Sequence, residues 1–357
     1  MDPRTIENVL SGIPYGKTQR LDTPDYSLKE SGNKVFAAVH QMKKHMTDEG
    51  WQMQMGLQDA GYVLSGCDFD RTFGKGTPVE WILKNYDPVQ TLIFQDKREW
   101  MGMTATQKKR PQESFINCHN AVQDDLFRMT VLKDSHALGA FNREFCNEIQ
   151  CHAWIVYYHP QIVNHLAPYT RQEDLIRTYH SIDSEKIPYF TFANKKRTFV
   201  SGALGDCYRL RQKLVTHARA LDIQHLRHPG YKNNVPHTDR FLKSILRYRV
   251  SLCTTSIYGY CLRKIIESVA CGCTVVTDLP VDDVLPHIDE CLVRIHPDLS
   301  IKEIRILIRK LGAEYDPEKA EHFSNLAKTY YDYRYLGMKL AKDIDGHRNM
   351  YKERPSQ

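Results

Sequence analysis

Residues 263–278 read RKIIESVACGCTVVTD, a helix-forming segment followed at once by a strand-forming one. Arg263 and Glu267 are four positions apart, so a helix places both side chains on the same face. Gly272 is a natural helix stop, because glycine readily adopts the left-handed conformation found after a helix C-terminus. The residues after it, CTVVTD, favour a buried strand. This segment therefore predicts one helix–strand unit of an α/β fold.

The same alternation extends on both sides of this unit. In the second half of the chain we expect strands over 197–203, 250–256 and 292–295, and helices over 208–222, 241–249 and 301–311. In the first half we expect strands over 34–41, 62–66, 91–95 and 153–160, helices over 51–60 and 77–86, and a polar helix with a linker over 169–183. A helical, tyrosine-rich tail follows residue 313.

The alternation predicts an α/β protein with two doubly wound, Rossmann-like domains facing a cleft. We place the domains at 1–185 and 186–330, with a helical tail over 331–357 that crosses back to the first domain. A length of 357 residues is about twice that of a usual domain, in agreement with this division. Ligands of such folds bind at the carboxyl ends of the strands.

Composition excludes several classes of protein. With 41% apolar and 26% charged residues, the chain is neither disordered nor collagen-like. No window approaches the roughly 20 apolar residues of a membrane span, and the first residues do not resemble a signal peptide. The ten cysteines form no C-x-x-C pair, so we expect reduced thiols, no zinc site and a cytoplasmic protein, which means the host cytoplasm if the protein is viral.

The net charge of +6 is unevenly distributed along the chain. Residues 195–264 contain 15 Lys and Arg against three Asp, a net charge of +12, so the remainder of the chain is negative. A concentrated positive field favours a polyanionic partner such as a nucleotide diphosphate, a nucleic acid or an acidic surface. Individually, many of these side chains are expected simply to be solvated on helix faces.

The stretch from Ser256 to Asp278 resembles the donor-domain signature of GT-B glycosyltransferases, and is most similar to the CgeB-like branch. The resemblance implies a GT-B architecture and a nucleotide-sugar co-substrate, in the first instance a UDP-sugar, with no tightly bound cofactor and no metal. It implies that Glu267 holds the nucleotide ribose and that Arg263 contacts the diphosphate. The alternative for this pair is an exposed ion pair of little energetic value. Tyr258 precedes Gly259, which stands where many relatives have a second Glu.

Further stretches are similar to the same family. Gly202 and the arginines Arg209 and Arg211 resemble the strand–loop–helix that opens the donor domain, where arginines can fork onto phosphate oxygens. His228, in the segment HPGY, is similar to the strand end that faces the nucleotide base. Further similar segments are 158–160, 179–183, and His40 together with Gly50-Trp51-Gln52. The resemblance implies that 1–185 is the acceptor side and 186–330 the donor domain.

Glycosyl transfer needs a base that activates the acceptor hydroxyl. Asp96 follows the strand TLIFQ, and the adjacent Lys97 and Arg98 would keep its carboxyl ionised. The alternative is that Asp96 only pairs with these cations. The rival bases are His40, which we keep as a second catalytic candidate, His136 and His159. The Asp68-Phe69-Asp70 triplet matches a metal-binding D-x-D pattern, but this short pattern arises readily by chance.

A second basic cluster bears on the identity of the acceptor. Its members, expected to bind acceptor or DNA, are Lys97, Arg98, Lys108, Lys109 and Arg110. Phage enzymes that glycosylate hydroxylated bases in DNA have a similar architecture, and they need cations for the phosphates. We therefore hypothesise a hydroxylated or hydroxymethylated pyrimidine in double-stranded DNA as acceptor. The alternatives are a polysaccharide, glycan or small-molecule acceptor, a nucleotide-sugar epimerase, and a non-catalytic DNA-binding protein with the same fold.

Overall fold

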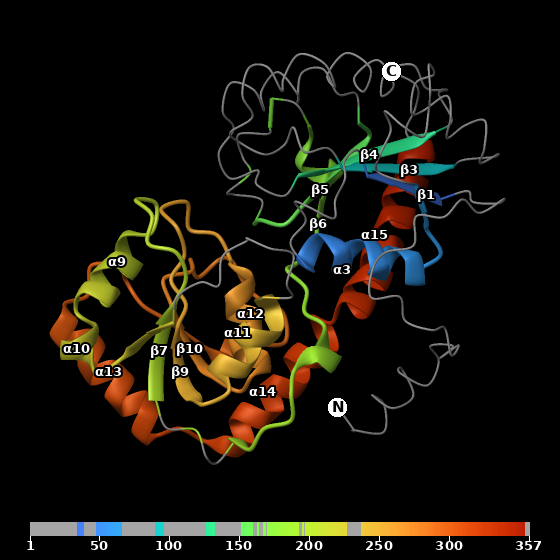
Figure 1. Cartoon of the computed structure of the whole chain (residues 1–357). Coiled ribbons are helices and arrows are strands. Elements are labelled where there is room, and N and C mark those ends of the chain that lie inside the picture. The colour runs from blue at the N-terminus through green and yellow to red at the C-terminus, as the bar shows by residue number, and fades with distance from the viewer. Residues whose placement is uncertain are drawn as a thin grey trace, which may run out of the picture.

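The computed structural model describes residues 34–38, 48–65, 90–95, 126–132, 151–159, 163, 167–168, 170–192, 195, 197–226 and 237–353. These residues form two parallel β-sheets, each accompanied by helices (Figure 1). We call the six-stranded sheet with α3 and α15 the first lobe, and the five-stranded sheet with α9 to α14 the second lobe. The predicted α/β class, with two doubly wound parallel sheets, is confirmed.

The first sheet has the strand order β2-β1-β3-β4-β5-β6, and every pairing in it is parallel. Its strands are β1 (Lys34–Ala38), β2 (Val63–Ser65), β3 (Thr91–Gln95), β4 (Phe127–Leu132), β5 (Ala153–Val156) and β6 (Leu175–Arg177). β4 and β5 are buried along their entire length, as expected for parallel strands covered on both faces. Chain order changes direction at β1, which lies between β2 and β3.

The second sheet has the strand order β11-β10-β9-β7-β8, again parallel throughout. Its strands are β7 (Arg197–Ser201), β8 (Gln224–Leu226), β9 (Tyr248–Leu252), β10 (Thr274–Thr277) and β11 (Leu292–Arg294). The chain leaves β7 for β8 on one side and returns to β9 on the other. The point between β7 and β9 is therefore the topological switch point, where ligands of open α/β sheets bind.

Helices cover both faces of the second sheet (Figure 1). On one face α9 (Arg209–Thr216), α10 (Ala218–Leu221) and α13 (Ile301–Ala313) contribute Leu214, Leu221 and Ile304 to one core. On the other face α11 (His237–Ile245), α12 (Arg263–Ala270) and α14 (Pro317–Tyr330) contribute Leu242, Ile265 and Phe323 to a second core. This two-sided burial explains why the strands read as continuous apolar runs.

Local sequence signals define several helix ends. Ser300 and Glu303 form a reciprocal capping box at the start of α13, and Asp316 caps α14 just before Pro317. After α12, Gly272 has a φ of +72°, as the sequence predicts. A Cβ atom there would lie 2.6 Å from the Phe192 ring, so the position is closed to other residues for two reasons.

The C-terminal helix α15 (Tyr333–Glu353) lies beside α3 (Asp48–Asp59) in the first lobe, as Figure 1 shows. The two helices touch at Gly56 and Gly337, where a Cβ atom on Gly337 would overlap the Gly56 backbone. Leu340 and Ile344 of α15 belong to the core of the first sheet, together with Trp154. The last helix of the chain thus belongs to the lobe that contains the N-terminal strands.

Two strands of the first sheet differ from expectation. The segment Leu175–Arg177, expected within a polar helix, is strand β6, and a short 3-10 turn over Gln172–Asp174 precedes it. Its pairing with β5 buries Ile176 and outweighs the helical spacing of its polar neighbours. β4 is absent from the strands expected from the sequence, because its residues, FRMTVL, show no regular alternation.

Candidate active site at the carboxyl edge of the second sheet

Four segments meet at the carboxyl edge of the second sheet. They are the turn at Gly202 after β7, the buried segment 253–256 after β9, Asp278 after β10, and the start of α12. Gly202 has a φ of +115°, a conformation that side-chain-bearing residues rarely adopt. The Asp278 carboxylate accepts a 2.6 Å hydrogen bond from the Thr255 backbone, which joins two of the strand ends. Both β7 and β9 flank the switch point, so this is where a ligand is expected.

Arg211 holds two of these loops together. Its guanidinium is buried and donates to the Ala203 carbonyl at 2.8 Å, and to the Thr254 hydroxyl and carbonyl, each at 3.1 Å. The Tyr208 ring lies 3.8 Å from it, a cation–π distance. A Cβ atom at position 202 would lie 2.7 Å from the guanidinium, so Gly202 is needed for this packing as well. Arg211, which the resemblance assigns to phosphate oxygens, thus joins the segment after β7 to the segment after β9. Arg209 is exposed at the first position of α9.

Arg263 and Glu267 form an ion pair, with 3.1 Å between Nε and the nearest carboxylate oxygen. The predicted sharing of one helix face is therefore observed. Only 15% of the Arg263 side chain and 8% of the Glu267 side chain are exposed, so the pair is not the exposed one that the alternative interpretation supposes. Two mostly buried opposite charges at the start of a helix are unusual unless the site binds a charged ligand or holds two parts of the protein together.

The Arg263 guanidinium also reaches the first lobe. Its Nη2 lies 3.4 Å from the side-chain amide of Gln52, on α3. The Gln52 amide nitrogen donates to the Ser181 hydroxyl at 2.9 Å and to the Ser181 carbonyl at 3.0 Å. Residues from α3, from the segment after β6 and from α12 therefore meet at one point.

Lys264 is a site residue that no motif in the sequence singles out, although it belongs to the positive segment. Its Nζ donates a 2.9 Å hydrogen bond to the Ser201 carbonyl, directly before the Gly202 turn. Burial, and after it the nearby Arg211 charge, lowers the pKa of Lys264 to about 7. The family resemblance rests on the adjacent Arg263. Successive residues of a helix project in different directions, and in the folded chain Lys264 projects toward the strand ends of the second sheet.

The loop before α12 places one tyrosine outward and one inward. Tyr258 is 39% exposed, and Gly259 has a φ of +66°, where a Cβ atom would lie 3.4 Å from the Pro280 ring. Tyr260 is buried and packs on Tyr158, with 4.4 Å between ring centroids. Tyr158 follows β5 of the first sheet, so residues at the carboxyl edges of both sheets touch here.

Several predicted residues lie outside the described residues. They are His40, Asp96, Lys97, Arg98, Lys108, Lys109, Arg110, His136, His228 and the Asp68-Phe69-Asp70 triplet. Of the rival bases, only His159 is described, at the end of the segment after β5. In the part of the chain that the structure describes, no three His, Cys, Asp or Glu side chains cluster as metal ligands. None of the described helices is long and apolar enough to cross a membrane.

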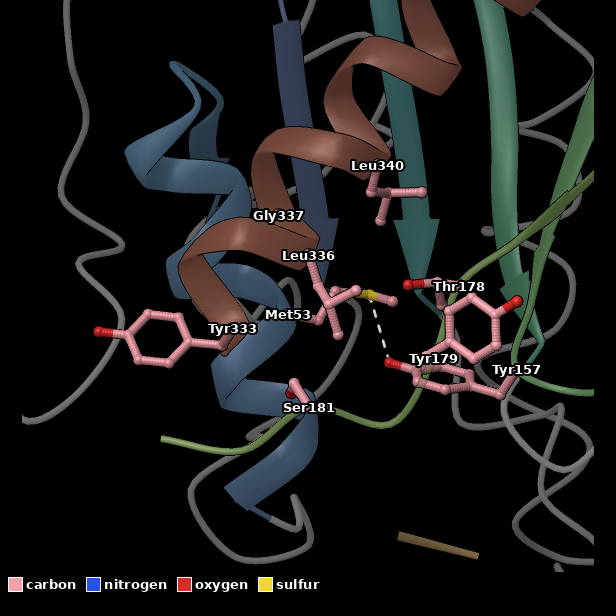
Figure 2. Close-up of a pocket in the computed structure, with 9 residues that line it drawn as sticks. All are labelled: Met53, Tyr157, Thr178, Tyr179, Ser181, Tyr333, Leu336, Gly337 and Leu340. Atoms are coloured by element: carbon pink, nitrogen blue, oxygen red, sulfur yellow. Dashed lines mark hydrogen bonds between the residues drawn. The ribbon is translucent and has the colours of Figure 1, made fainter. Parts of the chain in front are cut away.

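A small pocket lies between α3, α15 and the segment after β6 (Figure 2). It has room for about one water molecule. Met53, Tyr157, Ser181 and Leu340 are among the side chains around it, and the Tyr157 hydroxyl lies 3.6 Å from the Met53 sulfur. A pocket of this size holds no sugar or nucleotide, so it belongs to the packing between the elements rather than to a substrate site.

The positive segment 195–264 does not form one surface. Among its described members, Arg209, Arg211, Arg263 and Lys264 lie at or near the carboxyl edge of the second sheet. Lys195, Arg197, Arg247 and Arg249 lie at the opposite edge. Lys195 is buried there and donates to the carbonyls of residues 246, 248 and 271. The charge cluster along the sequence is thus divided in space.

No protein-family model and no curated protein matches this sequence. The structure, in contrast, resembles solved structures. A glycosyltransferase from Rickettsia africae aligns with a TM-score of 0.52 at 9% identity, over 90% of this chain and 100% of its own. Sucrose-phosphate synthase from Thermosynechococcus elongatus aligns with a TM-score of 0.55 at 9% identity, over the same shares. HepE from Anabaena, in complex with UDP, aligns with a TM-score of 0.52 at 10% identity, over 88% of this chain and 100% of its own.

These alignments run through most of both lobes of this chain. The chain has a GT-B fold. Identities of 9–10% place the similarity at the level of the fold. In this GT-B fold, the segment around Glu267 and Lys264 occupies the carboxyl edge of the second sheet, beside the switch point.

Proposed function

We propose that the protein is a glycosyltransferase that moves a sugar from a nucleotide-sugar, in the first instance a UDP-sugar, to an acceptor hydroxyl. The observation that carries this proposal is the meeting of Glu267, Lys264 and the Gly202 turn at the switch point of the second sheet. The fold supports it, because its solved neighbours include glycosyltransferases, and HepE was solved with UDP and glucose bound. On this proposal 186–330 is the donor domain, 1–185 the acceptor side, and 331–357 the crossing tail.

Each residue of the proposed site has a role that follows from its chemistry. The Glu267 carboxylate accepts hydrogen bonds from the ribose hydroxyls. Lys264, the N-terminus of α12 and the Gly202 backbone supply positive potential for the diphosphate as it departs with the nucleotide. Arg211 donates to the Ala203 carbonyl and so holds the loop after β7 from its buried side, while Arg209 and Tyr258 lie on the exposed side. His228 faces the base in this scheme.

The base and the acceptor come from the first lobe in this proposal. Asp96 removes the acceptor proton, and His40 is the alternative base. The cations Lys97, Arg98, Lys108, Lys109 and Arg110 hold the phosphates of double-stranded DNA, and a hydroxylated or hydroxymethylated pyrimidine is the acceptor. The resemblance to CgeB-like proteins and to phage-type DNA glycosyltransferases supports this choice. Cys207, Cys253, Cys271, Cys273 and Cys291 are free thiols, which supports a cytoplasmic location.

The experiment proceeds in two steps. Binding of UDP, GDP, ADP and dTDP is measured by calorimetry, and binding of none of them would contradict the transferase proposal. Labelled nucleotide-sugars are then offered with hydroxymethylated duplex DNA, unmodified duplex DNA and a panel of glycans. Transfer only to the hydroxymethylated duplex supports the DNA acceptor. Transfer only to glycans leaves the transferase proposal standing and overturns the DNA acceptor, and DNA binding without donor binding favours a non-catalytic protein.

A further inference from the structure

Arg177 and Asp283 form a mostly buried ion pair between the two lobes. Arg177 is the last residue of β6, at the carboxyl edge of the first sheet, and Asp283 lies in the segment after β10 of the second sheet. The Arg177 Nη2 atom donates to one oxygen of the Asp283 carboxylate at 2.5 Å. Only 17% of the Arg177 side chain and 2% of the Asp283 side chain are exposed. Two largely buried charges thus connect the carboxyl edges of the two sheets.

The Asp283 side of this pair is fixed within the second lobe. Arg294, the last residue of β11, donates from Nη2 to the Asp283 carbonyl at 3.1 Å. The same guanidinium binds both carboxylate oxygens of Asp289, at 2.8 and 2.9 Å, and Asp289 accepts from the Leu285 N–H at 2.8 Å. The segment between β10 and β11 is therefore braced from within its own lobe, and it offers Arg177 a partner in a defined place.

The chain crosses between the lobes twice, after β6 and between α14 and α15 (Figure 1). The two crossings are bonded to each other, since Ile182 donates to the Tyr331 carbonyl at 2.9 Å and accepts from the Tyr333 N–H at 3.0 Å. Two backbone hydrogen bonds at one point do not prevent one lobe from rotating against the other. Such a rotation would separate Arg177 from Asp283, because the two residues belong to different lobes.

Aromatic rings from both crossings lie beside the ion pair. The Tyr179 ring is 4.6 Å from the Arg177 guanidinium carbon, and the Tyr331 ring meets Tyr179 edge-on with 5.7 Å between ring centroids. The Tyr331 hydroxyl donates at 2.9 Å to the Pro286 carbonyl, in the segment that carries Asp283. With so little solvent access, the attraction between the two charges is only weakly screened.

Stability alone does not account for this pair. The desolvation of two buried charges offsets most of their attraction, and apolar side chains of similar volume often pack at least as stably. In the part of the chain that the structure describes, Arg177 Nε and the second Asp283 oxygen make no hydrogen bond, which adds to the cost. The pair does, however, favour one relative orientation of the lobes, because any other leaves both buried charges unpaired.

We propose that Arg177 and Asp283 are positioning residues for glycosyl transfer, which fix the orientation of the first lobe relative to the donor site. The inference rests on the proposed function, in which the acceptor and the base belong to the first lobe and the nucleotide to the second. Reacting groups carried by two lobes have to meet accurately, since a misplacement of about 1 Å can cost on the order of 100-fold in rate. The pair acts through the lobe orientation and not by contact with either substrate.

The first test removes both charges in the double variant Arg177→Met with Asp283→Leu. No buried charge is left unpaired, so the midpoint of thermal unfolding is expected to change by no more than a few degrees. Nitroxide labels on ketone-bearing amino acids, placed at the exposed positions Asn349 of α15 and Arg309 of α13, report the distance between the lobes by electron paramagnetic resonance. A broader or shifted distance distribution is expected, and an unchanged distribution would overturn the inference.

Lys339 and Asp343 provide the matched control. They also form an ion pair at 2.5 Å, but both lie on α15, and their side chains are 45% and 34% exposed. Lys339→Met with Asp343→Leu is expected to leave the distance distribution unchanged, and equal broadening in both double variants would contradict the inference. Asp283→Asn alone serves if the first double variant does not fold. It is expected to broaden the distribution less, because the amide still accepts a hydrogen bond, and no broadening would again overturn the inference.

The second test separates donor binding from transfer. In the Arg177→Met and Asp283→Leu variant, UDP affinity measured by calorimetry is expected to stay within about twofold, because the residues of the donor site are unchanged. The turnover of sugar transfer, to the acceptor that the panel of DNA and glycans identifies, is expected to fall at least about tenfold. Unchanged turnover, or a loss of UDP affinity as large as the loss of turnover, would overturn the positioning role.

Failure of this inference is distinguishable from failure of the proposed function. If the unsubstituted protein binds no nucleoside diphosphate and transfers no sugar, the proposed function is wrong and the positioning role fails with it, whatever the distance measurement gives. If the unsubstituted protein transfers sugar and the Arg177→Met and Asp283→Leu variant transfers it equally fast, only the inference fails.

Discussion

At the scale of the residue, Glu267 is the side chain on which the proposed donor site depends most. Its side chain is only 8% exposed and lies 3.1 Å from the Arg263 Nε atom, so its position is restricted before any ligand binds. Replacement by Gln keeps the size but removes the charge, which weakens both the ribose hydrogen bonds and the hold on Arg263. We expect UDP affinity to fall at least about tenfold, equivalent to ~1.4 kcal/mol. Calorimetry measures this.

The matched control for that substitution is Glu290→Gln, because Glu290 is exposed and lies on the other side of β10 in the sequence. It is expected to leave UDP affinity unchanged. Comparable losses in the two variants would mean that charge in general, and not the position of Glu267, governs binding.

The lowered pKa of Lys264 predicts that nucleotide affinity depends on pH. Burial lowers its pKa to about 7 in the free protein, whereas a bound diphosphate stabilises the protonated form and raises it. Nucleotide binding above pH 7 is therefore coupled to uptake of a proton by Lys264, and affinity falls as pH rises. The expected decrease approaches tenfold per pH unit between roughly pH 7 and 9.

Calorimetry in two buffers of different ionisation enthalpy measures the proton uptake. Lys264→Arg is the control, since a guanidinium stays charged over this range. The variant is expected to bind UDP with a flat pH profile and without proton uptake. Proton uptake in Lys264→Arg equal to that of the unsubstituted protein would assign the linkage to another group.

At the scale of the element, the contact between α3 and α15 determines how the C-terminal helix joins the first lobe. The two backbones approach at Gly56 and Gly337, and no larger residue fits at Gly337 without moving a helix. We expect Gly337→Ala to lower the free energy of unfolding by about 1–3 kcal/mol, the usual cost of overpacking. Thermal and chemical denaturation measure the loss.

Gly346 provides the matched control on the same helix. Among the described residues beyond its own stretch of helix, a Cβ atom there meets no atom within 4 Å, so Gly346→Ala is expected to stabilise α15 slightly through helix propensity. If Gly337→Ala were as stable as Gly346→Ala, the close approach of the two helices would be wrong.

The elements themselves were largely predictable where sequence signals are local. The strands β7, β9 and β10 and the helices α12 and α13 follow from apolar runs, caps and the Gly272 stop. β6 was not predictable in this way, because three residues become a strand only when β5 offers them a partner. β8 was not predictable from local signals either, because its sequence, QHL, contains no apolar run.

At the scale of the whole molecule, the proposed DNA acceptor leads to a prediction about the second basic cluster, which lies outside the positive segment. If DNA binds the acceptor lobe through 97–110, then changing Lys108, Lys109 and Arg110 to Gln lowers DNA affinity and reduces the salt dependence. The slope of log K against log [salt] is expected to change by about 0.9 for each DNA phosphate that the variant no longer neutralises. Fluorescence anisotropy at several salt concentrations measures both quantities.

The control for the DNA experiment is the double substitution Arg197→Gln with Arg247→Gln. Both side chains are exposed at the amino edge of the second sheet, away from the proposed donor site. Their removal is expected to leave the specific affinity unchanged. An equal loss from both sets of substitutions would indicate that DNA binds through overall charge, and that the basic loop has no special role.

The sequence by itself determined the α/β class, the doubly wound pattern and the Arg263–Glu267 pair, because hydrophobic periodicity and helical spacing act between neighbours in the chain. Only the tertiary structure decided which cations lie at the candidate site. Arg211 became a brace and Lys264 a site residue, since partners such as Thr254 and Ser201 come close only in the folded chain. It also brought Gln52 to Arg263 across 211 positions. Long-range contacts depend on how the two lobes pack, which no local pattern encodes.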